Sequence, residues 1–259
     1  MRKSNGFTLV ELVITMILLG MSAVFTLSFI GDGTRVFIDS VNRSEVSNYA
    51  KNLIFRMKRQ IESAIPYSIE VQTNNGNTYL QFIEPKAFSR IIEVDYLNNK
   101  ILLSTNEEAV LNNVSDDCKS NKKLILLQGR ELKAFDYSIN GHNITLINAD
   151  LKKVFEKYSS NASRVYFTDG CSFKRYYGLN DKLYYQSGFL DNNYKAVKTS
   201  ELNGNDIQVS GIIFNLSFNG NAVTPIQVKN SNSVVVGMLI TDHGQSVSLS
   251  HYMEVLNAP

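Results

Sequence analysis

One carboxylate stands inside a long apolar run near the start of this chain of 259 residues. Residues 7–30 read FTLVELVITMILLGMSAVFTLSFI, and Glu11 is the only charged residue among them. A charge at the depth of a bilayer costs about 2.5 to 3.5 kcal/mol on insertion scales, so such a residue is by default a functional one that has a partner. The sequence has no Lys, Arg or His between Glu11 and Arg35. The partner must therefore come from the chain terminus or from another molecule.

The two cysteines, Cys118 and Cys171, lie far apart in the sequence and form no CxxC pair. No histidine adjoins either of them, so a metal site or a thioredoxin-like redox site is disfavoured. In an oxidising compartment they would form a disulfide, which closes a loop of about fifty residues and stabilises the fold by about 4 kcal/mol in the chain-entropy model. In a reducing compartment they would remain two buried thiols.

Other residue types that support catalysis are scattered along the chain. His142, His243 and His251 form no HxxxH or HExxH pattern, and the sequence has no GxSxG, P-loop or GxGxxG motif. The acidic pairs at 107–108 and 116–117 lie in loop-like sequence. Calcium binding at 116–117 is conceivable because hard cations bind clustered oxygens, but a solvated turn is the simpler interpretation. We therefore predict no enzyme, no metal and no cofactor.

The charge balance excludes a strongly basic surface. The chain has 26 Lys and Arg against 24 Asp and Glu, for a net charge of +2. Arg56, Lys58 and Arg59 form a local basic group, but Phe55 is the only aromatic residue with them. Binding of single-stranded nucleic acid needs aromatic residues interleaved with basic ones. We therefore interpret this group as a solvated helix face and expect no nucleic-acid binding.

The apolar run 7–30 is the element that must position Glu11. At 1.5 Å per residue it makes about 36 Å of helix, which is enough to cross a bilayer. Arg2 and Lys3 precede it, and basic residues favour the cytoplasmic side, so the rest of the chain is expected outside the cytoplasm. A secretory signal would be shorter and would end in a small-x-small cleavage site, which Met21 and Ala23 do not form.

The helix is predicted to continue to residue 65. Gly31 and Gly33 each weaken a helix by about 1 kcal/mol, so a local weakness or bend is expected there. Residues 31–65 are amphipathic, with charged side chains opposite an apolar stripe. Pro66 should end the helix because a proline disfavours the α conformation in the residue before it. The stripe consists of Val41, Val46, Tyr49, Ala50, Leu53, Ile54, Met57, Ile61 and Ile65.

Residues 66–259 change to short runs of period two separated by turn residues, which predict about a dozen antiparallel strands. The predicted turns lie at 74–77, 98–99, 178–181, 219–221 and, with the strongest signal, at Asn140-Gly141. The fold class is therefore α+β: a long N-terminal helical spine, transmembrane in its first half, packed against a mostly antiparallel β domain. Aromatic residues in paired strands favour cross-strand packing over a sugar-binding platform at Tyr166, Tyr176, Tyr177, Tyr184 and Tyr185.

The start of the chain resembles the class III signal of type IV pilins and type II secretion pseudopilins. The resemblance rests on Arg2-Lys3, on residues 6–11 (GFTLVE) and on the uninterrupted apolar run. It implies cleavage between Gly6 and Phe7 by prepilin peptidase, N-methylation of Phe7, and a role of Glu11 in subunit assembly. The new α-amino cation of Phe7 would pair with Glu11 of a staggered neighbouring subunit, which removes the cost of both buried charges. The alternative is a plain signal anchor whose Glu11 is hydrated at the interface.

Later stretches resemble the minor pilins of the mannose-sensitive haemagglutinin (MSHA) pilus. These stretches are residues 164–167 (RVYF), 171–173 (CSF), 183–185 (LYY) and the ending 249–259. The resemblance implies a structural minor pilin that helps to initiate filament assembly near the tip. A large J-type pseudopilin of type II secretion is the nearest alternative. A membrane-anchored periplasmic enzyme or receptor is an alternative of a different class.

The resemblance also implies partners and a location. The partners are other minor and major pilins, prepilin peptidase, the inner-membrane pilus assembly platform and membrane lipid. After loss of the leader 1–6, residues 7–30 span the inner membrane of a Gram-negative bacterium with the N-terminus cytoplasmic. The helix 31–65 and the β-rich domain 66–259 then lie in the periplasm and later in the surface pilus. In the oxidising periplasm, Cys118 and Cys171 are expected to form a disulfide.

Overall fold

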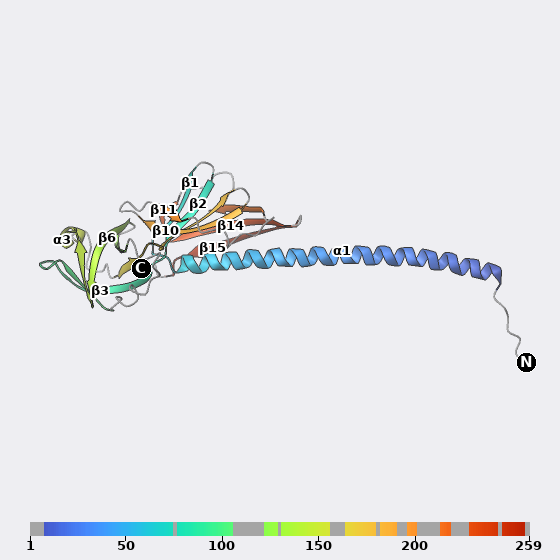
Figure 1. The fold of residues 1–259 in the computed structure, drawn as a ribbon, viewed down its shortest axis with the longest axis horizontal. Coiled ribbons are helices and arrows are strands. Elements are labelled where there is room, and N and C mark those ends of the chain that lie inside the picture. Colours follow the sequence, from blue (N-terminus) through green and yellow to red (C-terminus); the bar gives the residue numbers. More distant parts are fainter. Residues whose placement is uncertain are drawn as a thin grey trace, which may run out of the picture.

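The computed structural model describes residues 8–74, 77–105, 122–128, 131–155, 164–179, 182–190, 196–200, 213–218, 228–242 and 245–256. One long helix, α1 (Leu9–Glu62), leads into a set of antiparallel strands, which confirms the predicted α+β class. Figure 1 shows α1 as an unbroken, gently curved rod that extends far beyond the strands. The helix runs through Gly31 and Gly33 without interruption, so the weakness expected there does not break it.

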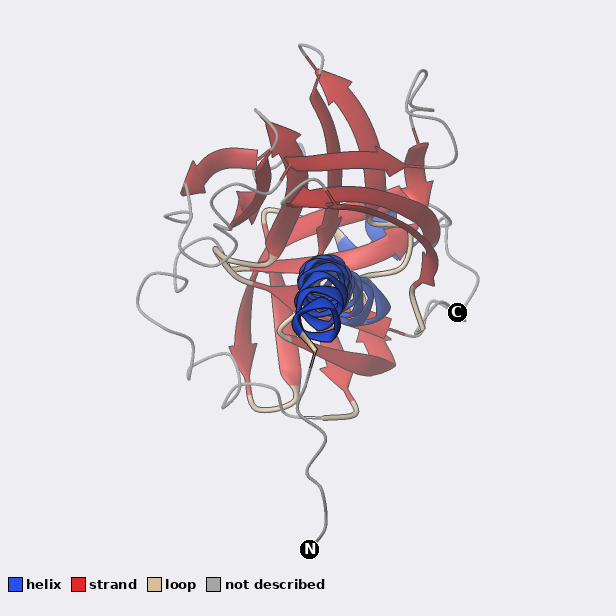
Figure 2. Cartoon of the chain, turned by 90° about the vertical axis from the view of Figure 1, so that its right-hand side faces the viewer, coloured by secondary structure: helices blue, strands red, loops and turns tan. Residues whose placement is uncertain are grey.

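The C-terminal part of α1 packs against the strands. Its buried residues follow the predicted stripe from Val46 onward: Val46, Ala50, Leu53, Ile54, Met57 and Ile61. Val41 was predicted to be in this stripe but is exposed, because packing against the strands starts only at Val46. Figure 2 looks along α1 from its N-terminal end, with the strands behind the helix.

The helix ends three residues before the predicted end. The backbone N–H of Ser63, the C-cap, donates to the carbonyl of Arg59 at 3.3 Å. Ile65 has left the helix, and its N–H donates to the carbonyl of Ile83 at 2.8 Å. The end of α1 therefore coincides with the hydrogen bond from Ile65 to Ile83, and Pro66 is not the only feature that marks it.

Two sheets pack against the buried stripe of the helix. The six-stranded sheet has the spatial order β11 (Ala196–Ser200), β10 (Lys182–Leu190), β9 (Phe173–Leu179), β2 (Asn77–Ile83), β1 (Ile69–Asn74) and β13 (Val228–Ser231). The three-stranded sheet has the order β12 (Ile213–Phe218), β14 (Ser233–Asp242) and β15 (Gln245–Glu254). One apolar core joins α1 to both sheets through residues such as Met57, Leu80, Tyr176, Val236 and Met253.

A closed barrel forms a second unit. Its strands, in order around the barrel, are β3 (Ala87–Asp95), β4 (Lys100–Leu103), β7 (Asn143–Ile147), β6 (Glu131–Asn140), β5 (Lys123–Gln128) and β8 (Arg164–Thr168). The short helix α3 (Leu151–Phe155) contributes to the apolar core of the barrel. β2 pairs directly with β9, so the whole barrel is inserted between two neighbouring strands of the six-stranded sheet. In Figure 1 it lies beyond the C-terminal end of α1, opposite the N-terminus.

The observed turns agree in part with the turns predicted from the sequence. Asn99 has a φ of 54° in the β3–β4 connection, as an Asn-Asn turn allows. In the β6–β7 hairpin Asn140 pairs with Asn143, so the loop is Gly141-His142, one residue later than predicted. Gly141 has a φ of 60°, the conformation that a type II′ turn requires at its first loop residue.

The predicted hairpin around 219–221 is only partly within the described residues. β12, its first strand, pairs with β14. A return strand over 222–228 is expected after this turn, but its last residue, Val228, begins β13, and β13 pairs with β1. The rest of that return strand lies outside the described residues.

Candidate functional site

The first two thirds of α1 stand clear of the rest of the protein. This helix is long and apolar enough to cross a membrane, and none of its most apolar stretch is buried within the protein. Large apolar side chains, among them Leu9, Phe25 and Phe29, are exposed along it. Since apolar surface of this extent is unfavourable in water, the stretch needs lipid or other apolar helices around it.

Glu11 lies in the first turn of this exposed helix. Thr8 is the N-cap, and its hydroxyl accepts a hydrogen bond from the backbone N–H of Glu11 at 3.3 Å. The same hydroxyl donates to Oε2 of Glu11 at 3.5 Å, a long and weak bond. Thr8 and Glu11 thus have the three-residue spacing of a capping box, and a carboxylate in the first turn is favoured by the helix dipole.

This geometry gives Glu11 contacts within its own chain that the sequence pattern did not reveal: the Thr8 hydroxyl accepts from its backbone N–H and donates to its carboxylate. Neither contact supplies a countercharge, so they do not replace the predicted pairing with an amine. Gly6 and Phe7, the predicted cleavage and methylation residues, lie outside the described residues. Thr8 itself has an extended backbone, with φ −76° and ψ 147°, so α1 begins directly after it.

The two predicted disulfide residues are described in part. Cys118 lies outside the described residues. Cys171 lies in the turn between β8 and β9, the point where the chain returns from the barrel to the sheet. Its backbone N–H donates to Oδ1 of Asp169 at 2.9 Å.

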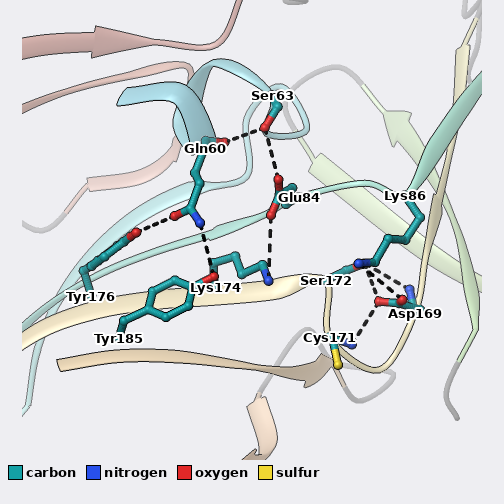
Figure 3. Close-up of polar contacts among 10 residues, drawn as sticks. All are labelled: Gln60, Ser63, Glu84, Lys86, Asp169, Cys171, Ser172, Lys174, Tyr176 and Tyr185. Carbon is teal, nitrogen blue, oxygen red and sulfur yellow. Dashed lines mark hydrogen bonds and ion pairs between the residues drawn. The ribbon is translucent and has the colours of Figure 1, made fainter. Parts of the chain in front are cut away.

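Asp169 holds the two connections of the barrel together. Its side chain is 1% exposed, and Oδ2 lies 3.6 Å from the ammonium of Lys86 on the other connection. The hydroxyl of Ser172 donates to Oδ1 at 3.0 Å. Backbone bonds from Glu84 to Ser172 and from Lys86 to Phe167, both 2.8 Å, add to this junction. Figure 3 shows the group beside the end of α1.

A second polar group links the last turns of α1 to the sheet (Figure 3). Gln60 accepts a hydrogen bond from the hydroxyl of Tyr176 and donates to the hydroxyl of Tyr185 at 3.3 Å. Ser63 donates to Glu84 at 3.4 Å, and Glu84 lies 3.7 Å from the ammonium of Lys174. Burial, with the neighbouring Tyr185 adding to it, raises the pKa of Tyr176 well above its usual range, so this tyrosine stays neutral.

The tyrosine pairs follow the strand register, as the cross-strand interpretation predicted. Tyr176 and Tyr185 are register partners with ring centroids 4.8 Å apart. Tyr177 is paired with Tyr184 at 5.2 Å on one side and with Tyr79 at 5.4 Å on the other.

The remaining candidates do not gather into a site within the described residues. His142 lies near the carbonyl of Leu103 at 3.3 Å, and His251 lies in β15. His243 and the acidic pairs at 107–108 and 116–117 lie outside the described part. In that part, no three His, Cys, Asp or Glu residues are placed to hold a metal ion.

Comparison with known families agrees with the geometry at the helix start. Residues 1–27 match the prokaryotic N-terminal methylation motif, which indicates a type IV pilin-like protein, either a pilin or a pseudopilin. Such proteins are structural subunits that interact with other pilins and with prepilin peptidase. No curated protein and no solved structure matches the chain closely enough to count as similar.

Proposed function

We propose that this chain is a minor pilin of an MSHA-type type IV pilus, similar to MshO, and that it helps to initiate filament assembly near the tip. One observation carries the proposal. The methylation motif coincides with a single carboxylate in the first turn of an apolar helix that the rest of the protein leaves unburied.

In this function the apolar run crosses the inner membrane, with Arg2 and Lys3 on the cytoplasmic side. Prepilin peptidase cleaves between Gly6 and Phe7, and Phe7 is N-methylated. The amine then lies at the depth of Glu11. Because the contact that Glu11 makes with Thr8 supplies no positive charge, its carboxylate is left to pair with the amine of an adjacent subunit.

The β-rich part then lies in the periplasm, where a disulfide between Cys118 and Cys171 is expected. Cys118 belongs to the inserted sequence between β4 and β5, and Cys171 lies in the turn that leads out of the barrel. The disulfide would therefore fasten the insertion to its own exit connection.

The J-type pseudopilin of type II secretion remains the second candidate because the same motif occurs in pilins and pseudopilins. Deletion of the gene for this chain distinguishes the minor pilin from the pseudopilin. A minor pilin should be required for surface pili and dispensable for type II secretion, whereas the opposite result would favour the pseudopilin.

The assembly role is tested with Glu11→Gln. Glutamine keeps the ability to cap the helix but removes the charge, so the variant should insert and be cleaved yet fail to co-purify with other minor pilins. Thr8→Ala is the matched control, since it removes the cap and keeps the carboxylate, and it should co-purify as the wild type does. Normal co-purification of Glu11→Gln would show that apolar helix packing carries assembly.

A further inference from the structure

Two cavities meet at the C-terminal end of α1. The first, of about 690 Å³, is lined by Phe55, Arg56, Arg59, Gln60, Ser63 and Glu84. The second, of about 600 Å³, lies between the helix end and the barrel, and its lining includes Ser63, Lys86, Phe88, Arg90 and Tyr166. Ser63 lines both, so the two cavities adjoin at this residue. We call the two cavities together the basic groove.

The basic groove has more positive than negative charge. Its acidic group, Glu84, already has Lys174 at 3.7 Å, and Lys86 already has Asp169 at 3.6 Å. Among the described residues no acid lies within ion-pair distance of Arg56, Arg59 or Arg90. Three arginines of the groove are therefore without an ion-pair partner among the described residues.

Arg90 is also placed against another cation. In the register of β3 and β8 it lies directly opposite Arg164. Arg164 has an interaction partner of its own. The pairing therefore places two guanidinium groups on neighbouring strands.

Two aromatic rings flank the arginines. Phe55 is 60% exposed on α1, and Phe88 is 52% exposed on β3. The guanidinium of Arg56 lies 5.4 Å from the centroid of Tyr185, which holds it beside the first cavity. Arginine and aromatic side chains, phenylalanine included, are enriched at protein interfaces.

We infer that the basic groove binds an acidic segment of a protein partner, with carboxylates against Arg56, Arg59 and Arg90 and apolar side chains against Phe55 and Phe88. A protein segment fits better than a nucleic acid because base stacking needs aromatic rings interleaved along one basic surface, whereas the two phenylalanines lie on separate elements. The inference is independent of the assembly role of Glu11, since no groove residue lies in the membrane segment.

The test uses the full chain in detergent and three fluorescent probes: a peptide that alternates Glu with Leu, the same peptide with Gln for Glu, and a single-stranded oligonucleotide. The Glu peptide should bind, more weakly as salt is raised, and the Gln peptide should not. Arg59→Gln and Arg90→Gln should each weaken binding about three- to fivefold, and the double variant about tenfold or more.

Lys58→Gln is the matched control because it removes the same charge from the same helix turns, but Lys58 pairs with Glu62 at 3.7 Å and does not line the groove. It should leave binding unchanged. The inference is overturned if the Glu peptide does not bind, if the Gln peptide binds equally well, if Lys58→Gln weakens binding as much as Arg59→Gln, or if the oligonucleotide binds more tightly than the peptide. Unaltered melting temperatures of the variants exclude loss of fold as the cause.

Discussion

The junction between barrel and sheet contains a buried carboxylate, that of Asp169. The Asp169→Ala variant measures how much stability this carboxylate contributes. In the native protein Asp169 receives hydrogen bonds from the Cys171 N–H at 2.9 Å and the Ser172 hydroxyl at 3.0 Å, and it faces Lys86 at 3.6 Å. Removing one partner of a fully buried pair costs about 3 to 5 kcal/mol. The Lys86 side chain is 36% exposed and can be rehydrated, so we expect a smaller loss, about 2 to 3 kcal/mol.

For a protein of this size, about 1 kcal/mol lowers the melting temperature by about 2 to 4 °C, so Asp169→Ala should lower it by about 4 to 12 °C. Glu131→Ala is the matched control. Glu131 also pairs with a lysine, Lys133 at 3.9 Å, but both side chains are exposed, 71% for Glu131 and 47% for Lys133. An exposed pair contributes at most about 1 kcal/mol, so the control should lose 4 °C or less. Calorimetry of the full chain in detergent gives both values, and an equal loss in the two variants would refute the reasoning.

Two further predictions concern the β-rich part. If Cys118 and Cys171 form a disulfide in the periplasm, reductant should lower the melting temperature by roughly 8 to 16 °C. Reductant should not change the melting temperature of the Cys118→Ser variant. Full alkylation of both thiols without reductant would contradict the disulfide. Burial raises the pKa of both Tyr137 and Tyr176, with the charge of Asp169 adding to it at Tyr137, so both stay neutral in the fold while unfolded tyrosines ionise above about pH 10. Stability should therefore be full below about pH 10 and fall as the pH rises further; a Tm series across this range checks the fall, and Tyr176→Phe should make it shallower.

The helix was the most predictable part of the fold. The apolar run and the later stripe repeat over many turns, and such periodicity depends on local sequence alone. Its end was less predictable, because Ile65 leaves the helix to bond Ile83, a partner that is distant in the sequence. Exposure of Val41 likewise depends on how far the strands extend along α1.

The barrel was not foreseen because strand patterns indicate pairing with near neighbours. The β6–β7 hairpin was found from Asn140-Gly141 to within one residue, since its turn is local. Pairing of β2 with β9, and of β3 with β8, joins strands separated by long stretches of sequence. No residue type near Ile83 or Phe173 signals that the intervening chain closes into a barrel.

The residues of the candidate site were likewise predictable from the sequence only in part. Glu11 was found from sequence because a lone acid in an apolar run is unusual, whereas its contact with Thr8 required coordinates. Arg56 and Arg59 were noted as a solvated face. Their place in a groove with Arg90 depends on the inserted barrel, which brings β3 to the end of α1.

The most direct test of the central claim is the mass of the mature chain. Protein purified from cells with active prepilin peptidase should begin at Phe7, carry one methyl group on its terminal amine, and lack residues 1–6. Cells without the peptidase should yield the uncleaved chain. A mature chain that keeps Arg2 and Lys3 in the presence of active peptidase would contradict the assignment to the pilin-like class of membrane-anchored subunits.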